Sequence, residues 1–93
     1  MSDAGRIVTP EDLGRIKALV RAARPSPWVS YVEGRDHISG SSFIMVGEGD
    51  SRCEDMEFSG VSHGDQDFIA SARQDVPNLI AEVERLWGVL DAL

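Results

Sequence analysis

The sequence predicts an α+β fold with an N-terminal helix, a small antiparallel β-sheet of three to four strands, and a long C-terminal helix kinked near Pro77. Apolar residues recur at helical spacing near both ends of the chain. Between these segments, short runs rich in aromatic and β-branched residues are separated by glycine-containing turns, a pattern typical of strands. Three short antiparallel strands need a helix across one face, which links the predicted strands to the predicted helices.

The size and composition are those of a single folded domain over residues 1–93. Of its residues, 42% are hydrophobic and 27% are charged, so disorder of the whole chain is not expected. A monomer of this size buries only about two-thirds of the surface that its unfolded chain exposes. Oligomerisation commonly supplies the missing burial.

The cysteine content and the apolar runs predict a soluble cytoplasmic protein. Cys53 is the one cysteine, which excludes an internal disulfide and fits a reducing compartment. The N-terminus "MSDAGRIVTPEDL" lacks the apolar core of a signal peptide. No apolar run approaches the roughly 18–20 residues of a membrane span.

The charge is uneven along the chain, although the net charge is −7. Residues 1–24 hold five basic side chains and three acidic ones, whereas the remainder holds 13 acidic side chains and four arginines. The acidic part would repel duplex DNA and an anionic membrane. It is either a solubilising surface or a face that meets a basic partner.

The first helix is predicted at about 10–23. Thr9 can cap its N-terminus and Pro10 suits the first helical position. Apolar residues, Leu13 first among them, recur on one face at spacings of three and four. Pro25 then ends the helix.

Three strands are predicted at about 28–33, 41–46 and 52–58. The continuous apolar run of 41–46 indicates the more central strand. The loop "GEGDS" (47–51) is typical of a hairpin connection. In the third strand, Cys53, Met56 and Phe58 are expected to turn inward, with a spacing that indicates a bulge.

The last segment contains two helix-start signals, so helices are predicted at about 66–74 and 76–92. Asp65 can cap the first. Asp75 can cap the second, because Pro77 suits a first turn and disfavours helical geometry at the residue before it.

An apolar stripe nevertheless runs across this expected break. Its members follow alternating spacings of three and four: Ile69, Ala72, Val76, Leu79, Val83, Leu86, Leu90 and Leu93. Such a stripe is longer than one small sheet requires, which predicts an oligomer interface. The expected interface residues are Val76, Leu79, Val83, Leu86, Trp87 and Leu90. Trp87 could pack either within its own subunit or against another chain.

No catalytic or metal-binding pattern is found, so the sequence predicts a protein that is not an enzyme and has no cofactor. His63, Asp65 and Asp67 do not have a metal-ligand spacing. Cys53 has acidic neighbours, which raise a thiol pKa. The acidic loop at 47–51 joins strand to strand, unlike a phosphate-binding loop.

The arginines of the acidic part are the candidate ligand-binding residues. Arg35 and Arg52 lie in or beside turns, and Arg73 lies at the expected helix break. Arginine suits bidentate phosphate contacts, and Trp28 or Tyr31 could stack on a base. Pairing of these arginines with nearby acidic side chains is the alternative interpretation.

Two motifs resemble Ead-like small accessory proteins of phages and prophages. "ARPSPW" (23–28) is similar to the family's "TPGPW" element, with Arg24 and Ser26 where threonine and glycine are usual. "DQDFIASARQDVPNLIAEVERL" (65–86) is similar to its closing pattern. The resemblance covers both ends of the chain and implies a phage or prophage protein in the host bacterial cytoplasm.

The resemblance implies a non-enzymatic protein that acts by binding, with a counter-defence role. We expect a homo-oligomer that sequesters a nucleotide signal or another small phosphorylated ligand at its subunit interfaces. The alternative is an acidic interaction module that blocks a basic host protein. Its surface would consist of Glu48, Asp50, Glu54, Asp55 and Glu57.

Overall fold

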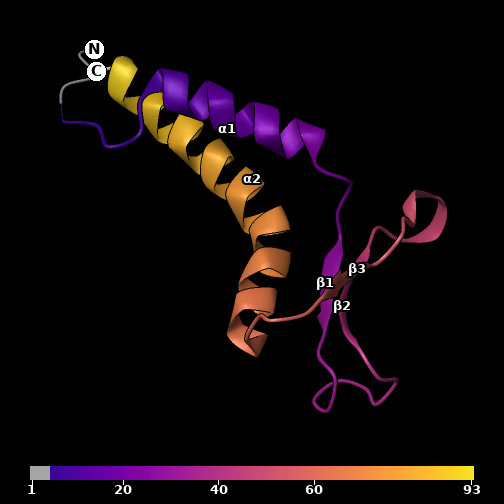
Figure 1. The fold of residues 1–93 in the computed structure, drawn as a ribbon. Coiled ribbons are helices and arrows are strands. Elements are labelled where there is room, and N and C mark those ends of the chain that lie inside the picture. The colour runs from indigo at the N-terminus through magenta and orange to yellow at the C-terminus, as the bar shows by residue number, and fades with distance from the viewer. Residues whose placement is uncertain (1–4) are drawn as a thin grey trace. The chain divides into compact units, whose positions relative to one another are not determined.

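The computed structural model describes residues 5–93 and confirms the α+β fold, in which a three-stranded sheet follows one helix and precedes the other along the chain (Figure 1). The elements in chain order are α1 (Pro10–Ala22), β1 (Trp28–Tyr31), β2 (Ser42–Val46), a short 3₁₀ helix η1 (Gly49–Ser51), β3 (Met56–Phe58) and α2 (His63–Asp91). None of the helices among the described residues combines the length and apolar character needed to cross a membrane.

The chain groups into two compact units. The sheet unit is Arg24–Asp75, which contains the three strands and the first part of α2. The helical unit combines the chain up to Ala23 with Val76–Leu93, and so contains α1 and the second part of α2.

Helix α1 begins where the sequence predicts. The Asp12 backbone N–H donates to Thr9 Oγ1, and the Thr9 backbone N–H donates to Asp12 Oδ2, both at 3.1 Å. This reciprocal capping box satisfies two N–H groups that the helix itself leaves free. The hydrogen bond from the Thr9 backbone, and then that from its side chain, lowers the pKa of Asp12.

The sheet is an antiparallel meander in the order β1-β2-β3, so β2 is central as predicted. β1 is shorter than predicted, because the chain turns directly after Tyr31. The Val32 N–H donates to Asp36 Oδ2 at 2.7 Å, and the Val32 carbonyl accepts from the Asp36 N–H at 2.9 Å. These local hydrogen bonds replace the ladder that a longer strand would need.

The connection from β2 requires glycine at Gly47. Its φ is +73°, and a Cβ at this position would lie 2.1 Å from the Ser51 carbonyl oxygen. β3 begins only at Met56, because residues 49–51 form the 3₁₀ turn and Cys53 makes a single ladder-like bond, from its N–H to the Val46 carbonyl at 2.9 Å. The predicted strand at 52–58 is therefore about half as long in the structure.

The structure confirms one long C-terminal helix, since α2 runs from His63 to Asp91 with Pro77 inside it, and it corrects the predicted division into helices at 66–74 and 76–92. Its N-terminal cap is Ser62 rather than Asp65. Ser62 Oγ accepts from the Asp65 N–H, and Asp65 Oδ2 accepts from the Ser62 N–H, both at 3.0 Å. Asp75 lies inside the helix, where it accepts a hydrogen bond from Ser71 Oγ.

A proline in a helix interior removes one backbone hydrogen bond and costs roughly 3 kcal/mol. Apolar burial on both sides of the proline explains why α2 continues. Ala70 is buried in the sheet unit and Ile80 in the helical unit. Burial of several such side chains, at about 1.5–3 kcal/mol each, outweighs the proline.

The core of the sheet unit lies between one face of the sheet and the first part of α2. Its centre is the cluster of Ile44, Val46 and Ala70. Cys53, Met56 and Phe58 pack against this cluster, which confirms that they turn inward. Trp28 and Ile69 complete it.

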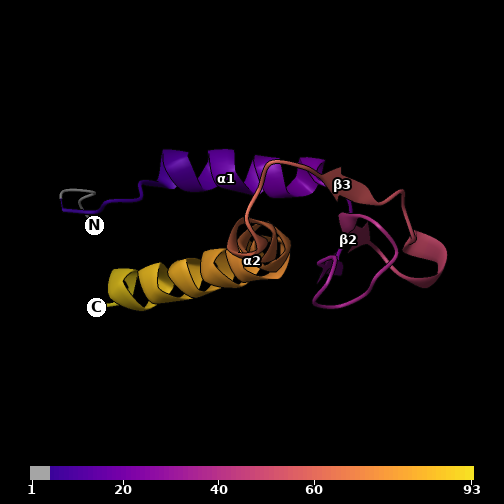
Figure 2. The same ribbon diagram turned by 60° about the horizontal axis from the view of Figure 1, so that its bottom comes forward.

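In the helical unit, α1 runs alongside the second part of α2 (Figures 1 and 2). Lys17 Nζ lies 3.0 Å from Glu84 Oε2. The Arg6 guanidinium lies over the Trp87 ring at 4.4 Å and is 4.0 Å from Asp91. Trp87 therefore has a cation–π contact within its own subunit.

Candidate functional site

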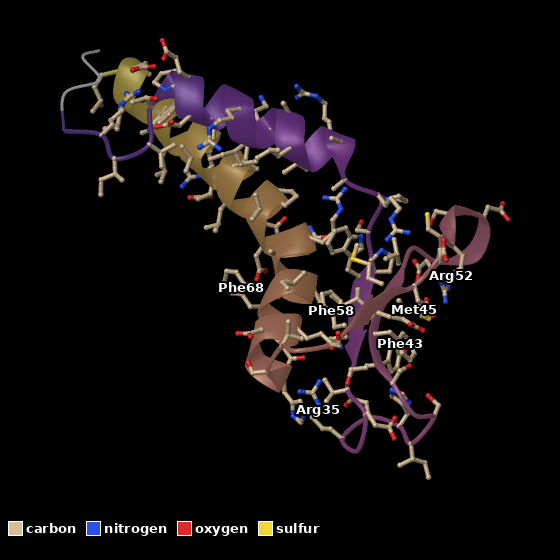
Figure 3. All side chains as sticks on the ribbon, in the orientation of Figure 1. Arg35, Phe43, Met45, Arg52, Phe58 and Phe68 are labelled. Atoms are coloured by element: carbon tan, nitrogen blue, oxygen red, sulfur yellow. The ribbon has the colours of Figure 1, made fainter. Side chains whose placement is uncertain are left out.

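The five ligand-binding candidates do not meet at one place within the chain. Trp28 pairs with Val46 at one end of the sheet, and Tyr31 pairs with Phe43 at the other. Arg52 lies at the Trp28 end and Arg35 at the Tyr31 end (Figure 3). The candidates thus form two separate groups.

Arg52 and Arg73 are held by oxygen atoms of the sheet unit. Arg52 Nη2 donates to Asp55 Oδ1 at 2.7 Å, and its Nη1 donates to the Cys53 carbonyl. Arg73 Nε donates to the Arg24 carbonyl at 2.8 Å, and Arg24 Nη1 donates to the Glu54 carbonyl at 2.7 Å. Arg73 links α2 to the segment before β1, Arg24 links that segment to Glu54, and Arg52 holds the chain between β2 and β3, so Arg52 and Arg73 have structural roles.

The two aromatic candidates also have partners. Trp28 packs against the core cluster, and its Nε1–H donates to the Pro25 carbonyl at 3.1 Å. The Tyr31 ring stacks on Phe43, with centroids 5.4 Å apart and an angle of 24° between the planes. Trp28 is therefore a core residue, whereas Tyr31 belongs to the opposite face of the sheet.

Arg35 joins the loop after β1 to Asp67 in the N-terminal part of α2. Its Nη1 and Nη2 donate to the two carboxylate oxygens of Asp67 at 2.7 and 2.9 Å, and Nη2 also donates to Asp36 at 2.9 Å. The Arg35 hydrogen bonds lower the pKa of Asp67 to about 2, with a smaller contribution from Ser30. They also lower the pKa of Asp36, and the two carboxylates raise the pKa of Arg35.

This ion pair predicts a specific response to acid. The pKa of Asp67 is depressed in the folded protein, so its contribution to stability is present above the ordinary value of about 3.8 and is lost as the pH falls toward about 2. We expect Arg35→Met to be less stable than wild type at neutral pH, with a difference that shrinks over this range. NMR titration should show the Asp67 pKa rising from about 2 toward its ordinary value of about 3.8 in the variant.

Arg21→Met is the matched control, because Arg21 is an exposed arginine on α1, outside this ion pair. It should leave the Asp67 pKa unchanged. An Asp67 pKa that stays near 2 in Arg35→Met would show that Arg35 is not its cause.

The face of the sheet away from α2 is apolar and partly exposed. We call it the outer face, and it consists of Val29, Tyr31, Phe43 and Met45. Figure 3 shows Phe43 and Met45 on the side away from α2 and Phe58 on the side toward it. Val29 is 37% exposed and the other three are half-buried. This face is not among the predicted sites, although the uninterrupted apolar run of β2 indicates a strand that is apolar on both sides.

The His37 ring packs beside the outer face, with its centroid 5.1 Å from that of Phe43. His37 Nδ1 accepts from the Ser39 N–H at 3.1 Å and lies 3.4 Å from Glu33 Oε2. Nε2 is buried without a hydrogen-bond partner among the described residues. Within residues 5–93, no three His, Cys, Asp or Glu side chains are grouped as a metal ion would require.

Acidic side chains dominate the sheet unit, where Arg24–Asp75 contains ten acidic residues and four arginines. Glu57 lies opposite Phe43 in the pairing of β2 with β3, so it borders the outer face. Of the five acidic residues predicted as a surface, Glu48, Asp50, Glu54 and Glu57 are exposed and Asp55 is held by Arg52.

Comparison of the chain with protein-family models, with curated proteins and with solved structures finds no match.

Proposed function

We propose that the chain is a non-enzymatic binding protein that docks a basic protein on the outer face of its sheet. The observation that carries the proposal is a partly exposed apolar face within a strongly acidic unit. Protein interfaces typically combine an apolar centre with a polar rim. Here Tyr31, Phe43 and Met45 supply the centre, and Glu57 lies on the rim.

The chemistry of this face defines the partner. Aromatic residues and methionine are enriched at interface centres, where a few anchors supply most of the affinity. A suitable partner would place an apolar or aromatic side chain against Phe43 and Met45. It would carry lysines or arginines around that side chain. The excess of acidic residues in the sheet unit would also speed the approach of such a partner.

The resemblance to Ead-like accessory proteins supports a biological setting for this binding. We propose that the partner is a protein of the bacterial host cell and that its blockage serves counter-defence by a phage or prophage. Asp67 and Pro77 belong to the second of the two motifs on which the resemblance rests.

Sequestering a nucleotide has less support from the geometry. Phosphate would have to displace Asp67 from Arg35 and Asp55 from Arg52, and these two arginines lie at opposite ends of the sheet. Calorimetric titration with linear and cyclic nucleotides is expected to give no binding heat. Binding by any of them that is lost in Arg35→Met would favour the nucleotide hypothesis instead.

Selection from a displayed library of random peptides tests the docking of a basic protein. We expect the full chain to enrich peptides with several lysines or arginines around an aromatic residue or leucine. The double variant Phe43→Ser and Met45→Ser should lose these peptides. The control Ile38→Ser should retain them, because Ile38 is 90% exposed but lies outside the strands.

Enrichment of acidic or uncharged peptides would contradict the proposed partner chemistry. Retention of the basic peptides by the Phe43 and Met45 variant would place their binding away from the outer face. An absence of any enriched peptide would also count against the proposal.

A further inference from the structure

The helical unit leaves large apolar side chains exposed along one edge of α2. We call Leu79, Leu86 and Leu90 the leucine edge, and their exposed fractions are 63%, 45% and 42%. Val76, Val83 and Trp87, which the sequence predicts in the same interface, are half-buried in the monomer. Helix α1 lies on their side of α2, because Leu13 and Ile16 of α1 line one groove together with Val76 and Val83.

An aliphatic groove lies between α1 and α2 in the same unit. Its volume is about 370 Å³. It is lined by Val8, Leu13, Ile16, Val76, Leu79, Ile80 and Val83. Leu79 belongs to both the groove and the leucine edge, so the two features are continuous on one face.

We infer that this face binds a second copy of the chain. The leucine edge of each copy would enter the groove of the other, and the two helix pairs would form a four-helix bundle with two-fold symmetry. A two-fold interface uses the same patch on both subunits, so one patch must contain both a projection and a recess. The shared position of Leu79 meets that requirement.

Charge complementarity favours a second copy over an acidic or basic partner at this face. The sequence of the helical unit holds six acidic and five basic side chains, so two helical units meet almost without net repulsion. Two sheet units, each with ten acidic residues and four arginines, would repel each other. Self-association is therefore directed to the helices, and the outer face stays available for a partner of opposite charge.

The dimer does not depend on the function proposed for the sheet unit. If both hold, each dimer presents two outer faces, and binding to a multivalent partner gains from effective concentration.

Sedimentation equilibrium over a range of protein concentrations tests the dimer. The full chain should have twice its monomer mass of 10.1 kDa. The double variant Leu79→Asp and Leu86→Asp should be monomeric, with a dissociation constant raised roughly 100-fold or more. Its circular dichroism should stay helical, since both side chains are exposed in the single chain.

Phe68→Asp is the matched control, because Phe68 is 75% exposed on the same helix but belongs to the sheet unit. It should leave the dimer intact. If the double variant fails to fold, Leu86→Ser alone should still weaken association measurably.

A monomer at every concentration would overturn the inference, and a trimer or larger assembly would overturn the two-fold arrangement. If Phe68→Asp dissociates the dimer and the leucine variants remain dimeric, the interface lies on the first part of α2 instead. If a monomeric leucine variant still binds the basic peptides, the dimer interface and the outer face are independent, because the substitution removes the dimer and leaves the outer face functional.

Discussion

Ile44→Ala is expected to lower the free energy of unfolding by about 2–5 kcal/mol. Ile44 is fully buried on the central strand, where it belongs to the core cluster with Val46 and Ala70. Removing its outer carbons forfeits their transfer free energy and leaves a cavity that three short strands and one helix cannot easily close. Small domains have a total stability of only about 5–15 kcal/mol, so the variant should be largely destabilised.

Urea denaturation followed by circular dichroism measures this effect. Ile38→Ala is the matched control, because Ile38 is 90% exposed in the loop between β1 and β2. Its stability should change by no more than about 0.5 kcal/mol. Equal effects of the two substitutions would contradict the placement of the core.

Local signals predict the fold well where they agree with packing. The cap of α1 at Thr9 and the central position of β2 were both predicted. Each depends on residues that are only a few positions apart in the sequence. The strands are shorter than predicted because their ends depend on hydrogen bonds such as that from Val32 to Asp36. Propensity alone does not report which polar group competes for a backbone N–H.

The error at α2 shows which signal is stronger when two disagree. Asp75 and Pro77 favour a new helix start, but the helix buries apolar side chains on both sides of them, at Ala70 and Ile80. This burial decides the outcome. The true start was also visible in the sequence, since Ser62 and Asp65 have the spacing of a capping box.

The candidate site was harder to predict, because arginine side chains choose partners that lie far away in sequence. Asp67 is 32 residues from Arg35, and no local pattern connects them. The choice between phosphate binding and an internal ion pair therefore required the fold. The outer face could have been predicted from the sequence, because Phe43 and Met45 alternate with the buried Ile44 and Val46 in one short strand.

Gln66→Leu should lower the free energy of unfolding by about 2–4 kcal/mol, although it adds an apolar residue to the interior. Gln66 is 1% exposed. Its Nε2 donates to Ser30 Oγ at 3.0 Å and to the carbonyls of Tyr31 and Phe43 at 3.1 and 3.0 Å. Leucine has a similar size and no donor, so these buried oxygens lose a partner, at about 1–3 kcal/mol for each one left unsatisfied.

The matched control is Phe68→Leu, because Phe68 is 75% exposed on the same helix, and we expect a change within about 0.5 kcal/mol. Equal stability of Gln66→Leu and wild type in urea denaturation would show that the hydrogen bonds of Gln66 do not hold α2 on the sheet.

Gln66→Glu separates the loss of a donor from the loss of shape, because glutamate keeps the size of glutamine. At neutral pH its carboxylate would face Ser30 Oγ and the Tyr31 and Phe43 carbonyl oxygens, so this variant should be less stable than Gln66→Leu. Burial would raise the pKa of the new carboxyl above its usual value of about 4.3. The unfolded chain then releases the proton first, so the deficit relative to wild type grows as the pH rises above about 4.3 and shrinks below it. Urea unfolding of both variants and wild type at several pH values should show this trend. A deficit independent of pH would place residue 66 in contact with water rather than buried between α2 and the sheet.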